Sequence, residues 1–193
     1  MAGDTAMLVT LAAVMLGTGA VAGVLAGLLG VGGGIVIVPV LYHIFTRFGP
    51  DLGVAPEALM HVAVGTSLAT IIPTSLVSAR KHHRRGAVDG ALLKSWAPGI
   101  VAGVIAGTLV AGAVKGAVLT GVFAAVALLV AVNMARPSGT AVIADRLPEG
   151  VTRHLISAVI GGFSALMGIG GGTLSVPILS AFGTPIRRAV GTA

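Results

Sequence analysis

Long stretches without any charged side chain constrain this sequence more than any other feature. No Asp, Glu, Lys or Arg occurs in residues 5–46, 58–79, 95–114, 116–135 or 154–186. A helix needs about 20 mostly apolar residues to cross a bilayer. Each of the three middle stretches fits one such helix, whereas the first and the last are too long and must break or turn back. The sequence therefore predicts an all-α, polytopic transmembrane helix bundle.

Composition supports lipid as the main surrounding of the chain and excludes several other classes of protein. Charged residues make up 9% of the chain and hydrophobic residues 55%, whereas soluble domains carry about 25% charged residues. There is no cysteine, and no metal-ligand cluster, nucleophile motif or P-loop occurs in the sequence. We therefore predict no enzyme activity, no bound metal and no cofactor, and the lipid bilayer as the main partner.

Basic residues between the apolar stretches predict the orientation of the chain. Residues 80–94 contain five Lys or Arg and a single acid, and residues 136–153 contain three arginines. The positive-inside rule places both predicted loops in the cytoplasm and the acidic segment 47–57 outside. The same rule explains the net charge of +6, so we predict no nucleic-acid partner.

Two sequence blocks occur twice in the chain. Residues 30–41 read GVGGGIVIVPVL and residues 168–179 read GIGGGTLSVPIL, with seven identical positions. The tetrapeptide AVGT follows in both cases, at 63–66 and at 189–192. Two blocks that keep their order indicate an internal duplication.

The duplication divides the chain into a first transmembrane repeat at 1–135, a cytoplasmic linker at 136–153 and a second repeat at 154–193. We expect the second repeat to be incomplete, either because the chain is a fragment or because another membrane subunit completes the bundle. The first repeat contains five apolar segments. Five net crossings would invert the second copy, a common plan in transporters. Parallel copies result if residues 7–48 cross only once, and we favour the inverted arrangement.

Three consecutive glycines in each block predict a broken helix, because each glycine costs about 1 kcal/mol relative to alanine. We expect breaks at 30–34 and 168–172, with a half-helix from near Ile35 and a matching one in the second copy. The start of a helix offers N–H groups and a positive dipole end to an anion. Two matched breaks in a membrane protein therefore predict an anion site, to which hydroxyls such as Thr173 and Ser175 add donors.

Other small or ionisable residues carry separate predictions. Gly99, Gly103 and Gly107 have the spacing of close helix packing in membranes. His61 lies near the start of an apolar stretch, where it is either a proton-coupling group or an interfacial side chain.

The motifs together resemble the sulfite exporter TauE/SafE family, also called the toluene-sulfonate uptake permease group. GVGGG with VPVL, AVGTSL at 63–68, HRRGAVD at 83–89 and the second glycine block carry this resemblance. It implies a secondary permease for a small sulfur-containing or organic anion (sulfite-like or sulfonate-like) in a prokaryotic plasma membrane. The alternative is a non-transporting membrane subunit or scaffold that needs a partner, and a homo-oligomer is also compatible.

The resemblance further implies which residues bind the substrate. In the first copy they are Gly32, Gly33, Gly34, Pro39, Gly65, Thr66 and Ser67, and in the second they are Gly170, Gly171, Gly172, Pro177, Gly191 and Thr192.

Overall fold

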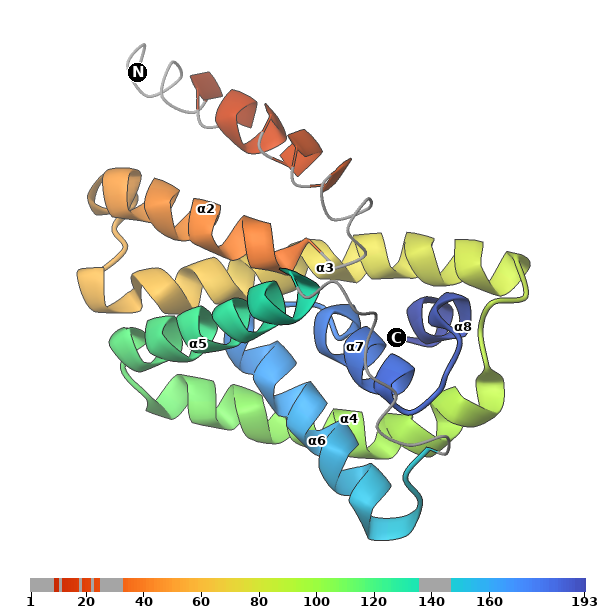
Figure 1. Ribbon diagram of the computed structural model, residues 1–193. Helices are drawn as coiled ribbons and strands as arrows, with labels where there is room; N and C mark the ends of the chain where they lie inside the picture. The colour runs from red at the N-terminus through yellow and green to blue at the C-terminus, as the bar shows by residue number, and fades with distance from the viewer. Residues whose placement is uncertain (1–8, 11, 18, 22, 25–32, 136–146) are drawn as a thin grey trace.

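The computed structural model describes residues 9–10, 12–17, 19–21, 23–24, 33–135 and 147–193. Their regular structure is entirely helical, which confirms the all-α prediction (Figure 1). Residues 30–32 of the predicted break at 30–34, Gly32 among them, and most of the predicted linker lie outside the described residues. Two short 3₁₀ turns, η1 (Pro50–Leu52) and η2 (Pro56–Ala58), connect the first two of the following helices: α2 (Gly34–Phe48), α3 (Leu59–Arg84), α4 (Gly90–Ala113), α5 (Gly116–Ala135), α6 (Gly150–Met167), α7 (Gly172–Ala181) and α8 (Ile186–Thr192).

Helix length divides these elements into two groups. α3 with the η2 turn, α4 and α6 are long and apolar enough to cross a membrane. α2 has 15 residues and α7 has 10, so at a rise of about 1.5 Å per residue they extend about 22 Å and 15 Å. Both are shorter than the hydrocarbon core of about 30 Å, as expected for half-helices that follow a break.

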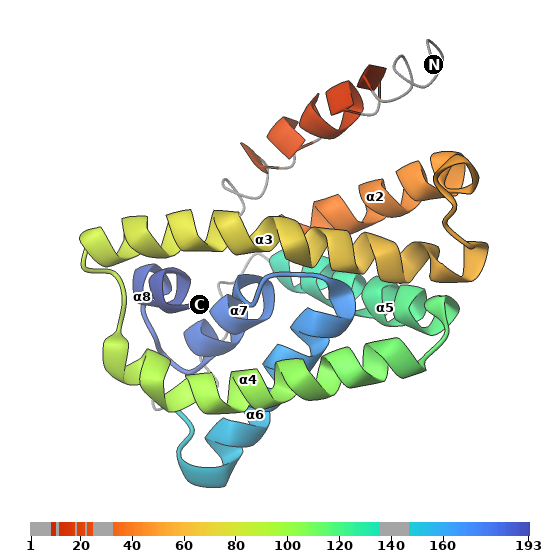
Figure 2. The same cartoon turned by 180° about the vertical axis from the view of Figure 1, so that it is seen from behind.

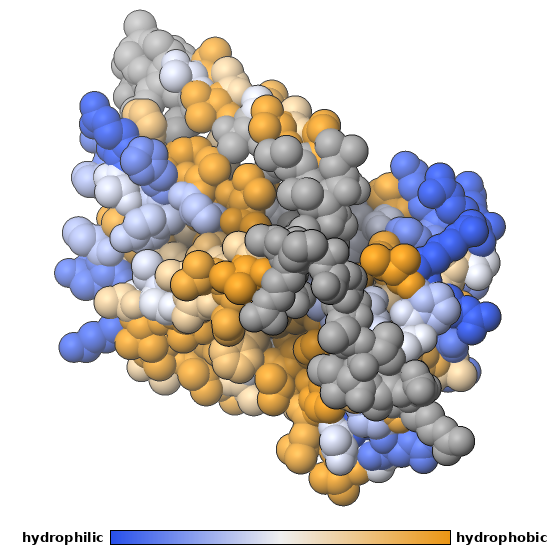
Figure 3. All heavy atoms as spheres, in the orientation of Figure 1, coloured by the Kyte–Doolittle hydropathy of each residue, from blue (hydrophilic) through white to orange (hydrophobic). Residues whose placement is uncertain are grey.

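The bundle has two hydrophilic ends with an apolar band between them (Figure 3). We call the end at the α3–α4 turn, residues 85–89, the basic end. The opposite end holds the α2–α3 connection and the α4–α5 turn, which meet because a Cβ at Gly116 would lie 2.9 Å from the carbonyl oxygen of Glu57. The lipid-facing band is exposed in this structure, with Leu109 70% and Leu129 68% exposed.

The connection at the basic end is shorter than the sequence predicts. We expected one loop over residues 80–94, but α3 continues to Arg84 and α4 begins at Gly90. Basic side chains in the last turn of α3 are favourable at the negative end of the helix dipole. The Asp89 carboxylate accepts hydrogen bonds from the N–H groups of Ala91 and Leu92 at 3.1 and 3.0 Å, and so caps α4.

The contact between α4 and α6 is the most extensive between described helices. A Cβ at Gly99, Gly103 or Gly107 would collide with the backbone of α6. Successive glycines of α4 meet successively later residues of α6, from His154 to Gly162, so the two helices run parallel. The predicted packing role of these three glycines is confirmed.

Two hydrophobic clusters lie on either side of the second glycine block. The first contains Met60, Val64, Leu119, Met167 and Ile169 with other residues near the opposite end. The second contains Leu92, Trp96, Ile160, Leu179 and Ala189 near the basic end. α6 therefore runs away from the basic end, and α7 returns to it, as both views of the ribbon show (Figure 2).

α8 also lies at the basic end. A Cβ at Gly191 would lie 2.5 Å from the carbonyl oxygen of Ala87, and the hydroxyl oxygen of Thr192 accepts a hydrogen bond of 3.0 Å from the Asp89 N–H. Arg187 and Arg188 begin this short helix. The structure thus brings the basic pair of the second copy to the end that carries the basic residues of α3.

Candidate functional site

The second glycine block breaks the helical path between α6 and α7. α6 ends at Met167, and Gly168 adopts a left-handed conformation with φ of +66°, which favours glycine. The Gly168 N–H donates to Ala165 O at 3.3 Å and the Ile169 N–H to Ser164 O at 3.0 Å. These bonds close the end of α6. The predicted break at 168–172 is therefore present, and α7 starts at Gly172.

A helix also starts at the last glycine of the first block. α2 starts at Gly34, the residue that aligns with Gly172, and each helix is preceded by a glycine, Gly33 or Gly171, in its N-cap position. Pro39 and Pro177 are the sixth residues of their helices. The half-helix predicted from near Ile35 is thus found one residue earlier.

The start of α2 touches the second break. A Cβ at Gly34 would lie 2.6 Å from the carbonyl oxygen of Gly168 and 2.7 Å from the Cα of Ile169. The contact therefore depends on glycine at position 34. The start of α2 and the backbone of the second break are in contact although 134 residues separate Gly34 from Gly168.

Ser67 of α3 holds the second break in place. Its side chain is fully buried, and its hydroxyl donates a 2.7 Å hydrogen bond to Gly168 O. A Cβ at Gly168 would also lie 3.0 Å from the Cα of Val64. The first AVGT block thus packs against the second glycine block, and the Ser67 hydrogen is used by the protein backbone.

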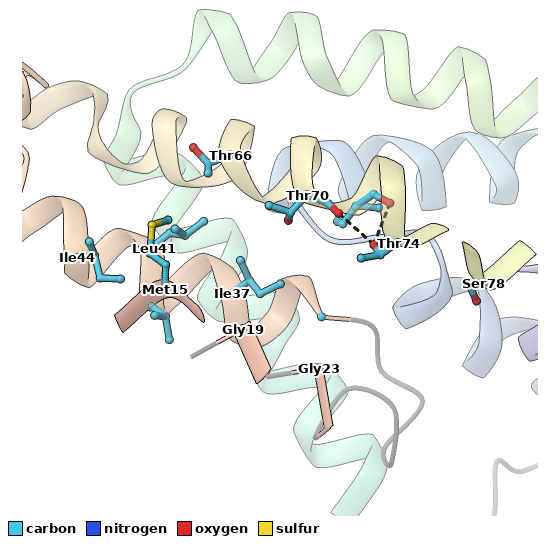
Figure 4. Close-up of a pocket in the computed structure, with 13 residues that line it drawn as sticks. Met15, Gly19, Gly23, Ile37, Leu41, Ile44, Thr66, Thr70, Thr74 and Ser78 are labelled. Carbon is cyan, nitrogen blue, oxygen red and sulfur yellow. Dashed lines mark hydrogen bonds between the residues drawn. The ribbon is translucent and has the colours of Figure 1, made fainter. Parts of the chain in front are cut away.

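A cavity of about 620 Å³ lies beside the first break. Gly33 and, in α2, Ile37 line one wall, and hydroxyl residues of α3 line another (Figure 4). Thr66 belongs to this wall, and the Thr70 and Thr74 hydroxyls donate to carbonyls of α3. No charged side chain is among the described residues that line the cavity, so its polar groups are neutral hydroxyls and backbone.

The second break is more enclosed and more polar in its side chains. Thr173 and Ser175 of α7 are 2% and 4% exposed, whereas the aligned positions of α2 are Ile35 and Ile37. Gly170 approaches the wall of the 620 Å³ cavity, because a Cβ at Gly170 would lie 3.7 Å from the side chain of Ile71. The second copy therefore contributes buried hydroxyls at positions where the first copy contributes isoleucine side chains.

Several predicted residues lie elsewhere. A Cβ at Gly65 would meet nothing within 4 Å. Gly191 and Thr192 pack against the α3–α4 turn and not against the breaks. His61 lies at the opposite end, where its Nε2 is 3.1 Å from both Ala111 O and Val114 O, the last carbonyls of α4. This geometry ties α3 to α4, and proton coupling by His61 stays a prediction.

Known proteins place the chain in a family. The model of the family described as sulfite exporter TauE/SafE matches residues 15–193. The chain belongs to this family. Its relatives include a probable membrane transporter protein of Haemophilus influenzae, 35% identical over 181 residues, and one of Methanocaldococcus jannaschii, 32% identical over 176 residues.

These alignments cover 90% and 89% of the chain but 64% and 62% of the two relatives. The chain thus spans less than two thirds of the length of these two relatives. No solved structure matches it.

Two buried hydroxyls were missed by reasoning from the sequence. Ser164 Oγ and Ser180 Oγ have no hydrogen-bond partner among the described residues. Ser164 lies one turn before the second glycine block of this TauE/SafE chain. Its position beside the block is the feature of the sequence that could have identified it.

Proposed function

We propose that this chain is part of a secondary permease for a small sulfur-containing or organic anion, such as sulfite or a sulfonate, in the plasma membrane of a prokaryote. The family name and the relatives named as probable membrane transporters support transport. The contact between the start of α2 and the second glycine break is the observation that carries the proposal. It gathers two helix starts, α2 and α7, in one region of an apolar bundle.

Two helix starts suit an anion for physical reasons. The first N–H groups of a helix have no carbonyl of their own helix to bind, and the helix dipole is positive there. In a region of low dielectric constant these partial charges act more strongly than in water. Glycine lets an oxyanion approach the backbone, while the Thr66 and Ser175 hydroxyls add neutral donors.

We also propose that the two copies are inverted, because the two half-helices run toward opposite ends of the bundle. α2 ends at the opposite end, where α3 starts, whereas α7 ends at the basic end, where α8 starts. Half-helices that run to opposite ends suit alternating access by movement of one copy against the other.

Labelling of introduced cysteines tests this topology, because the chain has no cysteine. We expect Arg85→Cys and Thr184→Cys to react with a membrane-impermeant maleimide from one side of the membrane. Asp51→Cys, at an exposed position like that of Arg85, should react from the other side. Labelling of Thr184→Cys together with Asp51→Cys would show parallel copies.

Sulfite flux into proteoliposomes tests the transport site through Gly33→Leu. A Cβ at Gly33 would meet the flexible tip of Ile37 at 3.0 Å, so the new side chain fills the cavity without striking backbone. We expect flux to fall at least about tenfold, which corresponds to 1.4 kcal/mol, with normal yield of folded protein.

Gly121→Leu is the matched control, because Gly121 is an exposed glycine of α5 with nothing within 4 Å of its Cβ position. Normal flux in Gly33→Leu would remove the proposed site. Flux that requires a second membrane polypeptide would favour the alternative of a non-transporting subunit.

A further inference from the structure

Ser164 is an exception among the hydroxyl residues of this bundle. In helices, Ser and Thr usually donate to a carbonyl three or four residues earlier. Ser157, also on α6, is fully buried and donates to His154 O at 3.1 Å. Ser164 is 6% exposed, and its Oγ has no partner among the described residues. A buried hydroxyl without a partner is unfavourable unless a ligand or water supplies one.

The position of Ser164 on α6 shows which region its side chain faces. Ile160 and Met167 lie four residues before and three after it, so all three share one face of the helix. Ile160 belongs to the cluster at the basic end and Met167 to the other cluster. Ser164 therefore faces the interior of the bundle between the two clusters.

The start of α7 lies at the same level. Ile169 belongs to the cluster of Met167, and Leu174 packs against the cluster of Ile160. The residues between them, Gly170 to Thr173, must therefore lie between the clusters, as Ser164 does. The helical bonds of α7 begin with the N–H of Thr173 donating to Gly170 O, so the N–H groups of the three glycines precede the helix's own hydrogen-bond ladder.

Space is present at the start of α7. A Cβ at Gly172 would meet nothing within 4 Å, and one at Gly171 would meet only Ser175 Oγ at 3.7 Å among the described atoms. These glycines are therefore not required by close packing, in contrast to those of α4. An open approach to a helix start and a buried hydroxyl without a partner at the same level are two independent features of an oxyanion site.

We propose that Ser164 binds the substrate directly: its hydroxyl donates to one oxygen of the anion, while the backbone N–H groups at the start of α7 bind another. This inference rests on the proposed function of the same region and adds a substrate-binding residue to it.

Two measurements on the purified protein test this inference. One is the sulfite-dependent rise in melting temperature, which gives a dissociation constant, and the other is the KM for sulfite flux in proteoliposomes. Ser164→Ala should raise the dissociation constant and the KM for sulfite by about tenfold, the loss expected for a hydrogen bond to a charged group.

Two controls separate this role from a structural one. Ser157→Ala removes a buried hydroxyl of α6 that already has a partner. Ser180→Ala removes a hydroxyl that has no partner among the described residues, near the other end of α7. Both should keep the wild-type dissociation constant for sulfite.

The outcomes distinguish the inference from the function on which it rests. Wild-type flux with an unchanged dissociation constant and KM in Ser164→Ala would overturn the inference alone, since the hydroxyl then binds only water. Binding without flux would overturn the transport proposal, and the affinity of Ser164→Ala would still decide the role of the hydroxyl. A wild-type protein that neither binds nor moves sulfite would overturn both.

Discussion

Glycine has two different roles in this bundle, one between α4 and α6 and the other at the two breaks. In α4, Gly99, Gly103 and Gly107 lie inside a regular helix and face the backbone of another regular helix. At the breaks, Gly34 begins a helix and faces a segment where the chain changes direction. The glycines of α4 let two helices approach closely, and Gly34 lets the start of α2 contact the second break.

The difference matters because the backbone of a regular helix and the backbone of a break differ in how easily they move. A regular helix cannot move one peptide group without disturbing its hydrogen-bond ladder. A break has fewer such bonds, so its backbone can shift. We therefore expect the α4–α6 contact to behave as a rigid unit, and the contact between the breaks to be the part that changes during transport.

The largest effect is expected for Gly103→Leu. A Cβ at this position would collide with the carbonyl group of Ala158, and the remaining leucine atoms would force α4 and α6 apart. The penalty should exceed the range of about 1–3 kcal/mol typical of an overfilled core. We expect almost complete loss of the monodisperse peak when the solubilised protein is analysed by size-exclusion chromatography.

Gly112→Leu provides the comparison on the same helix, because a Cβ at Gly112 meets nothing within 4 Å. It should give a normal peak. A normal peak for Gly103→Leu as well would show that the α4–α6 contact is not rigid, and the distinction between the two groups of glycine would then fail.

Reasoning from the sequence located helices better than the contacts between them. Charge-free stretches gave α3, α4 and α5 to within a few residues at most ends, since the hydrocarbon core itself sets that pattern. The end of α3 was missed because Lys and Arg, read as loop residues, also stabilise the end of a helix. The capping role of Asp89 was missed for the same reason, since it stood in the expected loop.

The site was predictable only in part. Three consecutive glycines indicate a break from local energetics, so Gly34 and Gly172 emerged as helix starts. The contact between Gly34 and Gly168 depends on how helices pack, which no local pattern in the sequence records. The same limit explains Gly191, whose neighbours lie in the α3–α4 turn, and Ser164, whose hydroxyl is notable only because packing leaves it without a partner.

A smaller effect is expected for Gly34→Ala, which tests the other side of the comparison. The added methyl group would lie 2.6 Å from Gly168 O and 2.7 Å from the Cα of Ile169. Both atoms belong to the backbone, so the start of α2 or the second break must move to admit the methyl group; we expect the protein still to fold, with a loss of about 1–3 kcal/mol. The apparent melting temperature should fall by several degrees and sulfite flux should decrease, because the start of α2 is displaced from the second break.

Gly172→Ala is the matched control for stability, since it places the same methyl group at the aligned position, where nothing lies within 4 Å. Its melting temperature should stay at the wild-type value or rise slightly, because alanine restricts the unfolded chain more than glycine does. An equal loss of stability in both variants would mean that glycine at these positions serves helix initiation alone. Loss in Gly34→Ala only would mean that the contact between the breaks holds the two copies together.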